Sequence, residues 1–262
     1  MSSMLRFTSF IAGILGFRGT ELLVAHHAPA VPLLRRWVSN LGLGLINGLI
    51  VSLACGFCFA FSPASTPSPI GLTLLPPPLC ITAEIIILDF ITYIFHRAYH
   101  ELPLLWRLHA VHHSDLDLDV SSASRFHPGE VLLSASAKVA IVFFLKISPL
   151  GLVTFETVML GCAQFQHSNI QISAPIERWL WRFLVPPEMH RLHHSPNIAD
   201  NNSNYGTILT VWDRALGTLN GRLRNAREPF GVAELGGRSL QLPALLLLPF
   251  RRVIQPVRPS TA

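Results

Sequence analysis

The clearest pattern in the chain is a run of apolar residues at 38–61 that contains no charged residue. About twenty consecutive apolar residues span the hydrocarbon core of a bilayer as a helix. Arg35 and Arg36 precede the run, and basic residues beside a span favour the cytoplasmic side. The pattern therefore predicts a transmembrane helix whose N-terminal end faces the cytoplasm.

A second apolar stretch, at about 79–95, returns across the membrane. The intervening segment 62–78 is rich in proline and serine, which is typical of a loop, and it would lie outside. The stretch carries Glu84 and Asp89 and is followed directly by the first histidine group. We therefore expect it to deliver those histidines to the cytoplasmic side.

Residues 131–166 are apolar again, with an interruption at Lys146, Ser148 and Pro149. This pattern predicts two short helices joined by a tight turn, which enter and leave the membrane on the same side. Lys138 and Glu156 lie within these helices. Charged residues at membrane depth normally face a partner or a cavity, and a flexible lysine could reach the glutamate.

The two ends of the chain differ from this pattern. Arg6 precedes an apolar stretch at 7–17, which predicts a short or interfacial N-terminal helix in place of a cleaved signal. Beyond residue 167 the chain is more polar and rich in arginine, which indicates a cytoplasmic cap. Residues 240–250 are apolar but short and contain two prolines, so we expect them to lie on the membrane surface or to pack on the cap.

Composition agrees with a membrane protein. Half of the residues are hydrophobic and only 13% are charged, against roughly 25% in an ordinary soluble domain. The expected fold is therefore all-α: an integral membrane bundle of about four transmembrane helices with a cytoplasmic helical cap. The net charge of +5 suits an anionic membrane face. A nucleic acid partner is disfavoured, because the basic residues are not interleaved with aromatic side chains.

Candidate chemistry lies in the histidines, ten of which fall between positions 96 and 194. Eight of these form one HxxxH and two HxxHH groups: His96 and His100; His109, His112 and His113; His190, His193 and His194. Residues three and four apart share one face of a helix, so each group presents several imidazoles together. Eight imidazoles exceed the needs of one tetrahedral ion. The pattern therefore predicts a site for two metal ions.

Imidazole ligands alone do not identify the metal, because they suit zinc, copper, iron and nickel. A hydrolytic zinc site usually adds a carboxylate, as in HExxH, and no acidic residue lies inside these groups. A redox site beside lipid would explain both the ligands and the membrane, which favours iron. Two alternatives remain: a membrane zinc hydrolase, and a non-enzymatic metal-binding or transport protein.

Further short motifs accompany the histidines, and together they resemble the fatty acid hydroxylase and sterol desaturase superfamily. The resemblance covers about residues 84–219. Its elements are DFITY at 89–93, WRLHAVHHSD at 106–115, RFHPGE at 125–130, FQHSN at 165–169, NYG at 204–206 and WDRALGT at 212–218.

The resemblance implies two iron ions, bound by histidines on the cytosolic side of the membrane. The implied ligands are His96, His100, His109, His112, His113, His190, His193 and His194, joined by His167 and His127. His127 has an alternative role, in which it orients the site or lines the path of the substrate. No further catalytic residue is expected. Ligand histidines need a partner at the second ring nitrogen, and the candidates are Asp89, Asp115, Asp119, Glu130, Asn169, Asn204 and Asp213.

The implied activity is hydroxylation of a lipid C–H bond with dioxygen, and desaturation or ether-lipid oxidation are alternatives on the same site. The chain contains no GxGxxG motif after a strand, so electrons would come from a separate ferredoxin, or from a cytochrome with its reductase. We expect three segments: an N-terminal membrane region with the outer loop (1–79), a catalytic domain of this family (80–220) and a cytoplasmic tail (221–262).

Overall fold

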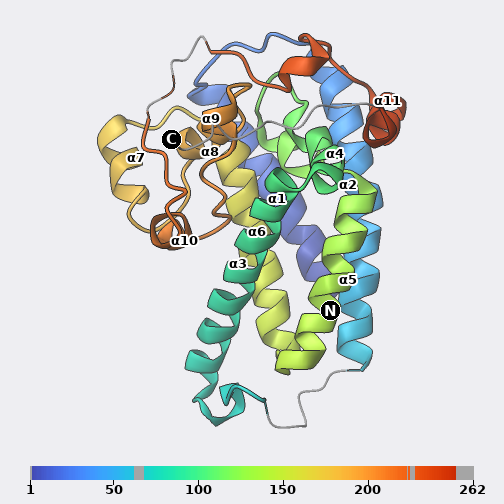
Figure 1. Cartoon of the computed structure of the whole chain (residues 1–262), viewed down its shortest axis with the longest axis vertical. Helices are drawn as coiled ribbons and strands as arrows, with labels where there is room; N and C mark the ends of the chain where they lie inside the picture. The colour runs from blue at the N-terminus through green and yellow to red at the C-terminus, as the bar shows by residue number, and fades with distance from the viewer. Residues whose placement is uncertain (1, 62–67, 223, 225–227, 252–262) are drawn as a thin grey trace.

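The computed structural model describes residues 2–61, 68–222, 224 and 228–251, and the regular elements within these ranges are all helices. Five long helices run side by side, and short helices form a cap over one end of them (Figure 1). The long helices are α1 (Ser2–Leu23), α2 (Leu33–Ala60), α3 (Pro77–Glu101), α5 (Pro128–Leu145) and α6 (Pro149–His167). The all-α architecture predicted from the sequence is confirmed.

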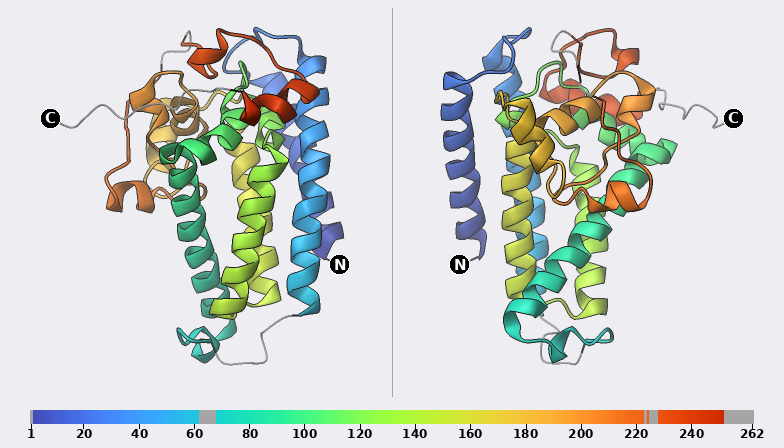
Figure 2. Two further views of the ribbon diagram at one scale, coloured as in Figure 1. Left: turned by 45° about the vertical axis from the view of Figure 1, so that its right-hand side comes forward. Right: turned by 90° about the vertical axis from the view of Figure 1, so that its left-hand side faces the viewer.

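Within the described residues, α2, α3 and α5 are long and apolar enough to cross a membrane. The chain is therefore a multi-pass membrane protein with three candidate spans, where the apolar pattern predicted about four. α6 is not among these three candidate spans, although it is a long helix of the same bundle (Figure 2). Helix α2 packs against α5, and α6 packs against both α1 and α3.

The predicted turn between two helices at 146–149 is confirmed, and it is held by a buried carboxylate. Lys146 adopts a left-handed backbone with φ 60°, and Ser148 caps α6. Glu84 of α3 accepts hydrogen bonds from the backbone N–H and the hydroxyl of Ser148, at 2.6 and 2.7 Å. The predicted pairing of Lys138 with Glu156 is also present. The acidic residues within the bundle therefore have partners.

The structure corrects one expectation for the N-terminal region and adds to another. α1 has 22 residues and follows α6 along the bundle, so it is not short. α2 begins at Leu33, because Pro32 supplies the extended residue before the helix. Arg36 thus lies inside the helix, where it is buried and bonded to Asp115 and Asp119, so its charge does not face the membrane surface.

The cap consists of α4 (Pro103–His113) and a set of short helices that follow α6. These are α7 (Ala174–Leu180), α8 (Pro187–His193), α9 (Ile198–Asn201), α10 (Val211–Ala215) and α11 (Leu242–Leu247). α11 packs on α2, and its Leu245 is buried with Trp106 of α4. The apolar segment 240–250 therefore packs on the cap, which was one of the two expectations for it.

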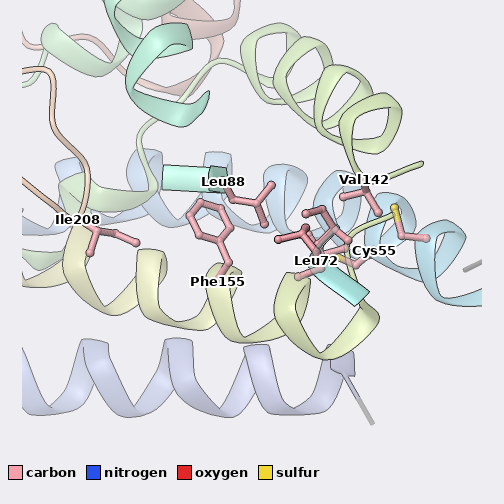
Figure 3. Close-up of a cluster of buried hydrophobic side chains, with 9 residues drawn as sticks. Cys55, Leu72, Leu88, Val142, Phe155 and Ile208 are labelled. Atoms are coloured by element: carbon pink, nitrogen blue, oxygen red, sulfur yellow. The ribbon is translucent and has the colours of Figure 1, made fainter. Parts of the chain in front are cut away.

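The apolar core of the bundle lies between α2, α3, α5 and α6. Figure 3 shows Phe155 of α6 and Leu88 of α3 close together, with Val142 and Cys55 in the same cluster. Ile208 belongs to this cluster although it comes from the cap segment between α9 and α10. One segment of the cap thus reaches down to the level of the membrane helices.

Candidate metal centre

Nine histidines converge beneath the cap in two separate groups. The first group is His96, His100, His109, His113 and His193, and the second is His112, His167, His190 and His194. All nine are buried, and within each group one nitrogen of each ring lies within 4.8 Å of the others. The two groups therefore form two adjacent candidate metal sites built from imidazole alone.

The two HxxHH motifs are shared between the sites in a reciprocal way. In α4, His109 and His113 face the first group while His112 faces the second. In the second motif, which begins in α8, His190 and His194 face the second group while His193 faces the first. Residues four apart share a helix face, and the residue between them points to one side. Each motif thus contributes to both sites and sets the two sites next to each other.

Hydrogen bonds at the first group fix which ring nitrogens are free to bind a metal. Nδ1 of His96 lies 2.8 Å from the carbonyl oxygen of Tyr205, and Nδ1 of His193 lies 2.7 Å from that of Ser203. A carbonyl only accepts, so each Nδ1 carries the proton and each Nε2 bears a lone pair. The two Nε2 atoms are 3.1 Å apart. Two lone pairs at this distance repel unless a cation lies between them.

The second group repeats this arrangement. Nδ1 of His112 faces the carbonyl of Arg125 at 3.3 Å, and Nδ1 of His167 faces that of Ala163 at 2.7 Å. Their Nε2 atoms, again without protons, are 3.1 Å apart, and Nε2 of His190 lies 3.0 Å from that of His167. The donor set at both sites therefore fits a bound metal cation.

Burial keeps these imidazoles in the neutral form that binds metals. It lowers the pKa of His193 to about 3 and holds the pKa of His112 and His194 well below the usual range. The neighbouring imidazoles act in the same direction on His112 and His194, because a second positive charge would repel the first. At neutral pH all three rings are available as ligands without loss of a proton.

Glu130 contacts a histidine of the first group, as its position in the sequence suggested. Its carboxylate accepts a hydrogen bond from Nδ1 of His109 at 2.8 Å. Nε2 of His109 is buried and has no hydrogen-bond partner among the described residues. A carboxylate of this kind fixes the ring orientation and raises the basicity of the opposite nitrogen.

His127, in contrast, lies outside both groups. Its Nδ1 accepts a hydrogen bond from the backbone N–H of Gly129, which caps α5, and its Nε2 donates to the carbonyl of Leu246. Both ring nitrogens are thus engaged away from the metal sites. His127 is therefore not part of either histidine group, and its alternative role, in orienting the site or lining the path of the substrate, stays a prediction.

Two of the expected histidine partners instead order the segment that follows α9. The carboxylate of Asp89 accepts hydrogen bonds from Thr207, from the backbone of residues 208 and 209, and from the indole of Trp212. Asp213 accepts from the backbone N–H groups of Tyr205 and Gly206. Neither carboxylate bonds to a histidine directly. Asp213 thereby fixes the backbone at Tyr205, whose carbonyl holds His96.

The four remaining candidates stabilise connections around the site. Asp115 and Asp119 both bind Arg36. Asn169 bonds to the backbone of His27. Asn204 has a left-handed backbone with φ 56°, a conformation that asparagine tolerates, and its amide bonds to the backbone of residue 220. These side chains hold the cap together and do not orient the imidazoles themselves.

Sequence reasoning missed most of the groups that hold the second ring nitrogens. Four of them are backbone carbonyls, at positions 125, 163, 203 and 205. Asn201 was also missed: its side-chain amide lies 3.0 Å from Nδ1 of His113, and its nitrogen donates to the carbonyl of residue 193. Every residue has a backbone carbonyl, so the sequence does not show which carbonyls bond to the histidines. Asn201 could have been found, because it is a polar residue shortly after the third histidine group.

Comparison with known proteins is consistent with this geometry. Residues 81–218 match the model of the family described as fatty acid hydroxylase. The chain belongs to this family. The matched segment contains all nine histidines of the two groups, so the resemblance seen in the motifs is confirmed. No solved structure matches the chain.

Several curated proteins are similar to this chain. The ornithine lipid hydroxylase OlsE of Rhizobium tropici is 32% identical over 181 residues, which cover 68% of this chain and 52% of that protein. The alkylglycerol monooxygenase of Homo sapiens is 31% identical, covering 56% of this chain and 31% of that protein. The cholesterol 25-hydroxylase of Mus musculus is 26% identical, covering 59% and 50%. The chain spans about half or less of the length of these relatives.

Proposed function

We propose that this protein is a membrane-bound di-iron oxygenase that hydroxylates a lipid C–H bond with dioxygen and external electrons. The observation that carries the proposal is the pair of buried imidazole groups in which unprotonated Nε2 atoms face each other at 3.1 Å. The site lies between the cap and the membrane bundle and has imidazole ligands only, without the carboxylate that a hydrolytic zinc site usually adds. The membrane helices would give an apolar substrate access to it.

The number of donor atoms favours iron over zinc. The first group offers five imidazoles and the second offers four, whereas structural zinc is almost always bound by four ligands in a tetrahedron. Iron accepts the wider set of ligands that the first group offers.

The relatives support a lipid as the substrate. Their names describe hydroxylation of ornithine lipid and of cholesterol, and oxygenation of alkylglycerol. All three are lipids, although their head groups differ. Hydroxylation is our first proposal. Oxidation of an ether lipid is the second, since alkylglycerol monooxygenases of several animals match the chain. Desaturation would use the same site.

Different residues of this chain have different roles in the proposed reaction. When bound, iron would supply the oxidising power that no acid–base pair of side chains provides for an unactivated C–H bond. The imidazoles hold the site and exclude water by their burial. Glu130 keeps the proton on Nδ1 of His109, and the carbonyls of Tyr205 and Ser203 do the same for His96 and His193.

The electron donor and the side of the membrane follow from the same proposal. The described residues form helices only and contain no fold that binds a flavin or nicotinamide cofactor. We therefore propose that electrons come from a separate ferredoxin, or from a cytochrome with its reductase. Such donors are cytoplasmic, and the cap would face them. The exposed Arg35, near the cap end of α2, and the arginines of the cap would suit an acidic partner.

The test is to purify the protein anaerobically in detergent, reconstitute it with iron, and supply a lipid extract with a ferredoxin and its reductase. We expect close to two irons per chain, and dioxygen uptake that matches the amount of hydroxylated lipid found by mass spectrometry. Retention of a stable alcohol supports hydroxylation, whereas release of an aldehyde identifies an ether-lipid substrate. A zinc-loaded protein that cleaves lipid esters without dioxygen uptake would contradict the proposal.

A further inference from the structure

Part of the cap lies at the depth of the membrane helices. The indole of Trp212, in α10, donates to the carboxylate of Asp89 at 2.7 Å and packs on Phe90, with ring centroids 4.8 Å apart. Asp89 is six residues before the end of the apolar stretch of α3 at position 95, which is about 9 Å deeper at ~1.5 Å per residue. The burial of Ile208 with Leu88 and Phe155 places the preceding segment at the same depth.

α7 is attached to this deep segment. Residues 184 and 209 form a β-bridge, and Arg214 of α10 donates to the carbonyls of Trp181 and Arg182, just after α7. In Figure 1, α10 lies beside α3 below α8 and α9, and α7 lies on the same side of the molecule. α7 and α10 are thus held together as one unit, which is attached at membrane depth through α10.

The outer surface of this unit is apolar and exposed. Ile176, Trp179 and Phe183 are 54%, 57% and 59% exposed, and their spacing of three and four places them on one side of α7 and its C-terminal turn. Val211 of α10 and Leu216, directly after it, are also exposed. We call these five residues the α7–α10 face. Its counterpart on α3, with Ile86, Phe90 and Ile94 exposed, is the lipid-facing surface of a candidate span.

We propose that the α7–α10 face is inserted into the acyl chains of the leaflet beside the cap, so that it continues the lipid-facing surface of α3. The occupant is lipid, because the contact between Trp212 and Phe90 joins the two exposed apolar surfaces at one depth. Arg178 and Arg182 are exposed on the same helix and the turn that follows it. Long basic side chains reach from an apolar surface to headgroup phosphates, and tryptophan is enriched at this level.

The inserted face would connect the membrane to the metal centre. The segment between α9 and α10 carries Tyr205, whose carbonyl holds His96, and this segment is bonded to Asp89 in the span. Lipid substrate leaving the leaflet along α3 would therefore meet the face before it meets the histidines. This consequence rests on the proposed function, but the insertion itself does not.

The experiment uses tryptophan fluorescence of the full chain in nanodiscs made with phospholipids that are brominated on their acyl chains. The contribution of Trp179 is the difference between the native protein and Trp179→Phe, and Trp181→Phe is the matched control because Trp181 lies two residues away and is less exposed. We expect brominated lipid to quench most of the Trp179 component, to quench the Trp181 component less, and aqueous iodide to leave the Trp179 component unchanged.

Two results would overturn the inference. Quenching of the Trp179 component by iodide and not by brominated lipid would place the face in water. Protection from both quenchers would mean that protein covers it, either a second copy of this chain or a partner. Because no step needs iron, substrate or turnover, failure here is distinguishable from failure of the proposed oxygenase activity.

Discussion

His96 and His193 come from helices almost a hundred positions apart in the chain, yet their unprotonated nitrogens face each other. The backbone carbonyls of Tyr205 and Ser203 impose this arrangement by holding the proton on the far side of each ring. The folded protein thus contains two nitrogen lone pairs that repel each other, and a bound cation would remove this repulsion. Metal binding is therefore expected to stabilise the folded chain.

Replacing His193 with Ala should remove a ligand from the first site and abolish turnover, because the two ions would act as one oxidant. Metal analysis should show the loss of about one ion per chain. His26→Ala is the control, since His26 lies outside both groups and should leave metal content and product formation unchanged. If His193→Ala keeps both ions and near-normal activity, the assignment of this histidine is wrong.

Glu130 offers a graded test at the same scale. Glu130→Ala removes the acceptor for Nδ1 of His109 and should lower metal affinity or activity by roughly 10–100-fold. Glu130→Gln keeps an oxygen that can accept the hydrogen bond, so it should recover much of the loss. Titration of the apoprotein with ferrous iron measures both variants. Equal losses for Ala and Gln would indicate that the charge, and not the hydrogen bond, matters.

The histidine motifs could be recognised from the sequence because side chains with chelating spacing are unusual. The sequence did not show how the histidines of each HxxHH motif divide between the two sites. His112 and His113 are adjacent, and either could face either ion. The partners of the second nitrogens were harder still. Asp89 was expected to be a partner of a ligand histidine, but its carboxylate already accepts four hydrogen bonds from the segment at 207–212.

At the scale of elements, the hairpin of α5 and α6 depends on charges buried in the bundle. Glu156 is bonded to Lys138 and lies 3.7 Å from Arg6 of α1. Glu156→Leu would leave two cations without a counterion, whereas Lys138→Met would leave Glu156 with Arg6. Removing one partner of a buried pair costs about 3–5 kcal/mol, and Glu156→Leu should approach this value while Lys138→Met costs less.

Thermal unfolding in detergent of the two single variants and the double variant measures this coupling. The double variant should be more stable than Glu156→Leu alone, because it removes one of the stranded cations. Thr154→Ala is a matched control, since Thr154 is partly exposed on the same helix and its hydroxyl bonds to the carbonyl one turn earlier. Additive losses in the double variant would show that the pair contributes nothing.

Helices α2, α3, α5 and α6 could be predicted because apolar runs and interrupting prolines mark them directly. Their ends could not be placed as well. α3 extends to Glu101, because His96 and His100 continue the helix although they are polar. The length of α1 was missed because only its apolar part, at 7–17, was read as helix. Arg18 and Glu21 follow that part and pair with each other at 3.1 Å within the helix.

At the scale of the whole molecule, a buried polar network joins the first membrane span to the metal centre. Arg36 and Asn40 of α2 bond to Asp115, directly after the second histidine group, and Asn40 also accepts from Arg125. Arg36 and Arg125 hold the pKa of Asp115 well below its usual range, against the effect of burial. The N-terminal span is therefore part of the support of the site, and the side on which it starts sets the side of the site.

Orientation in the membrane gives the last prediction. Exposed Arg35 near the cap end of α2, together with the arginines of the cap, favours a cytoplasmic cap. In a Cys80→Ala background, which removes a partly exposed native thiol, Thr73→Cys lies exposed in the connection at the opposite end and Ser239→Cys lies exposed in the cap. An impermeant maleimide applied to intact cells should label Thr73→Cys, and should label Ser239→Cys only after the cells are opened. The Cys80→Ala parent, with its remaining cysteines buried or partly buried, gives the background signal. The reverse pattern would place the histidines on the outer side, where a cytoplasmic ferredoxin could not reach them, and would exclude the proposed electron donor.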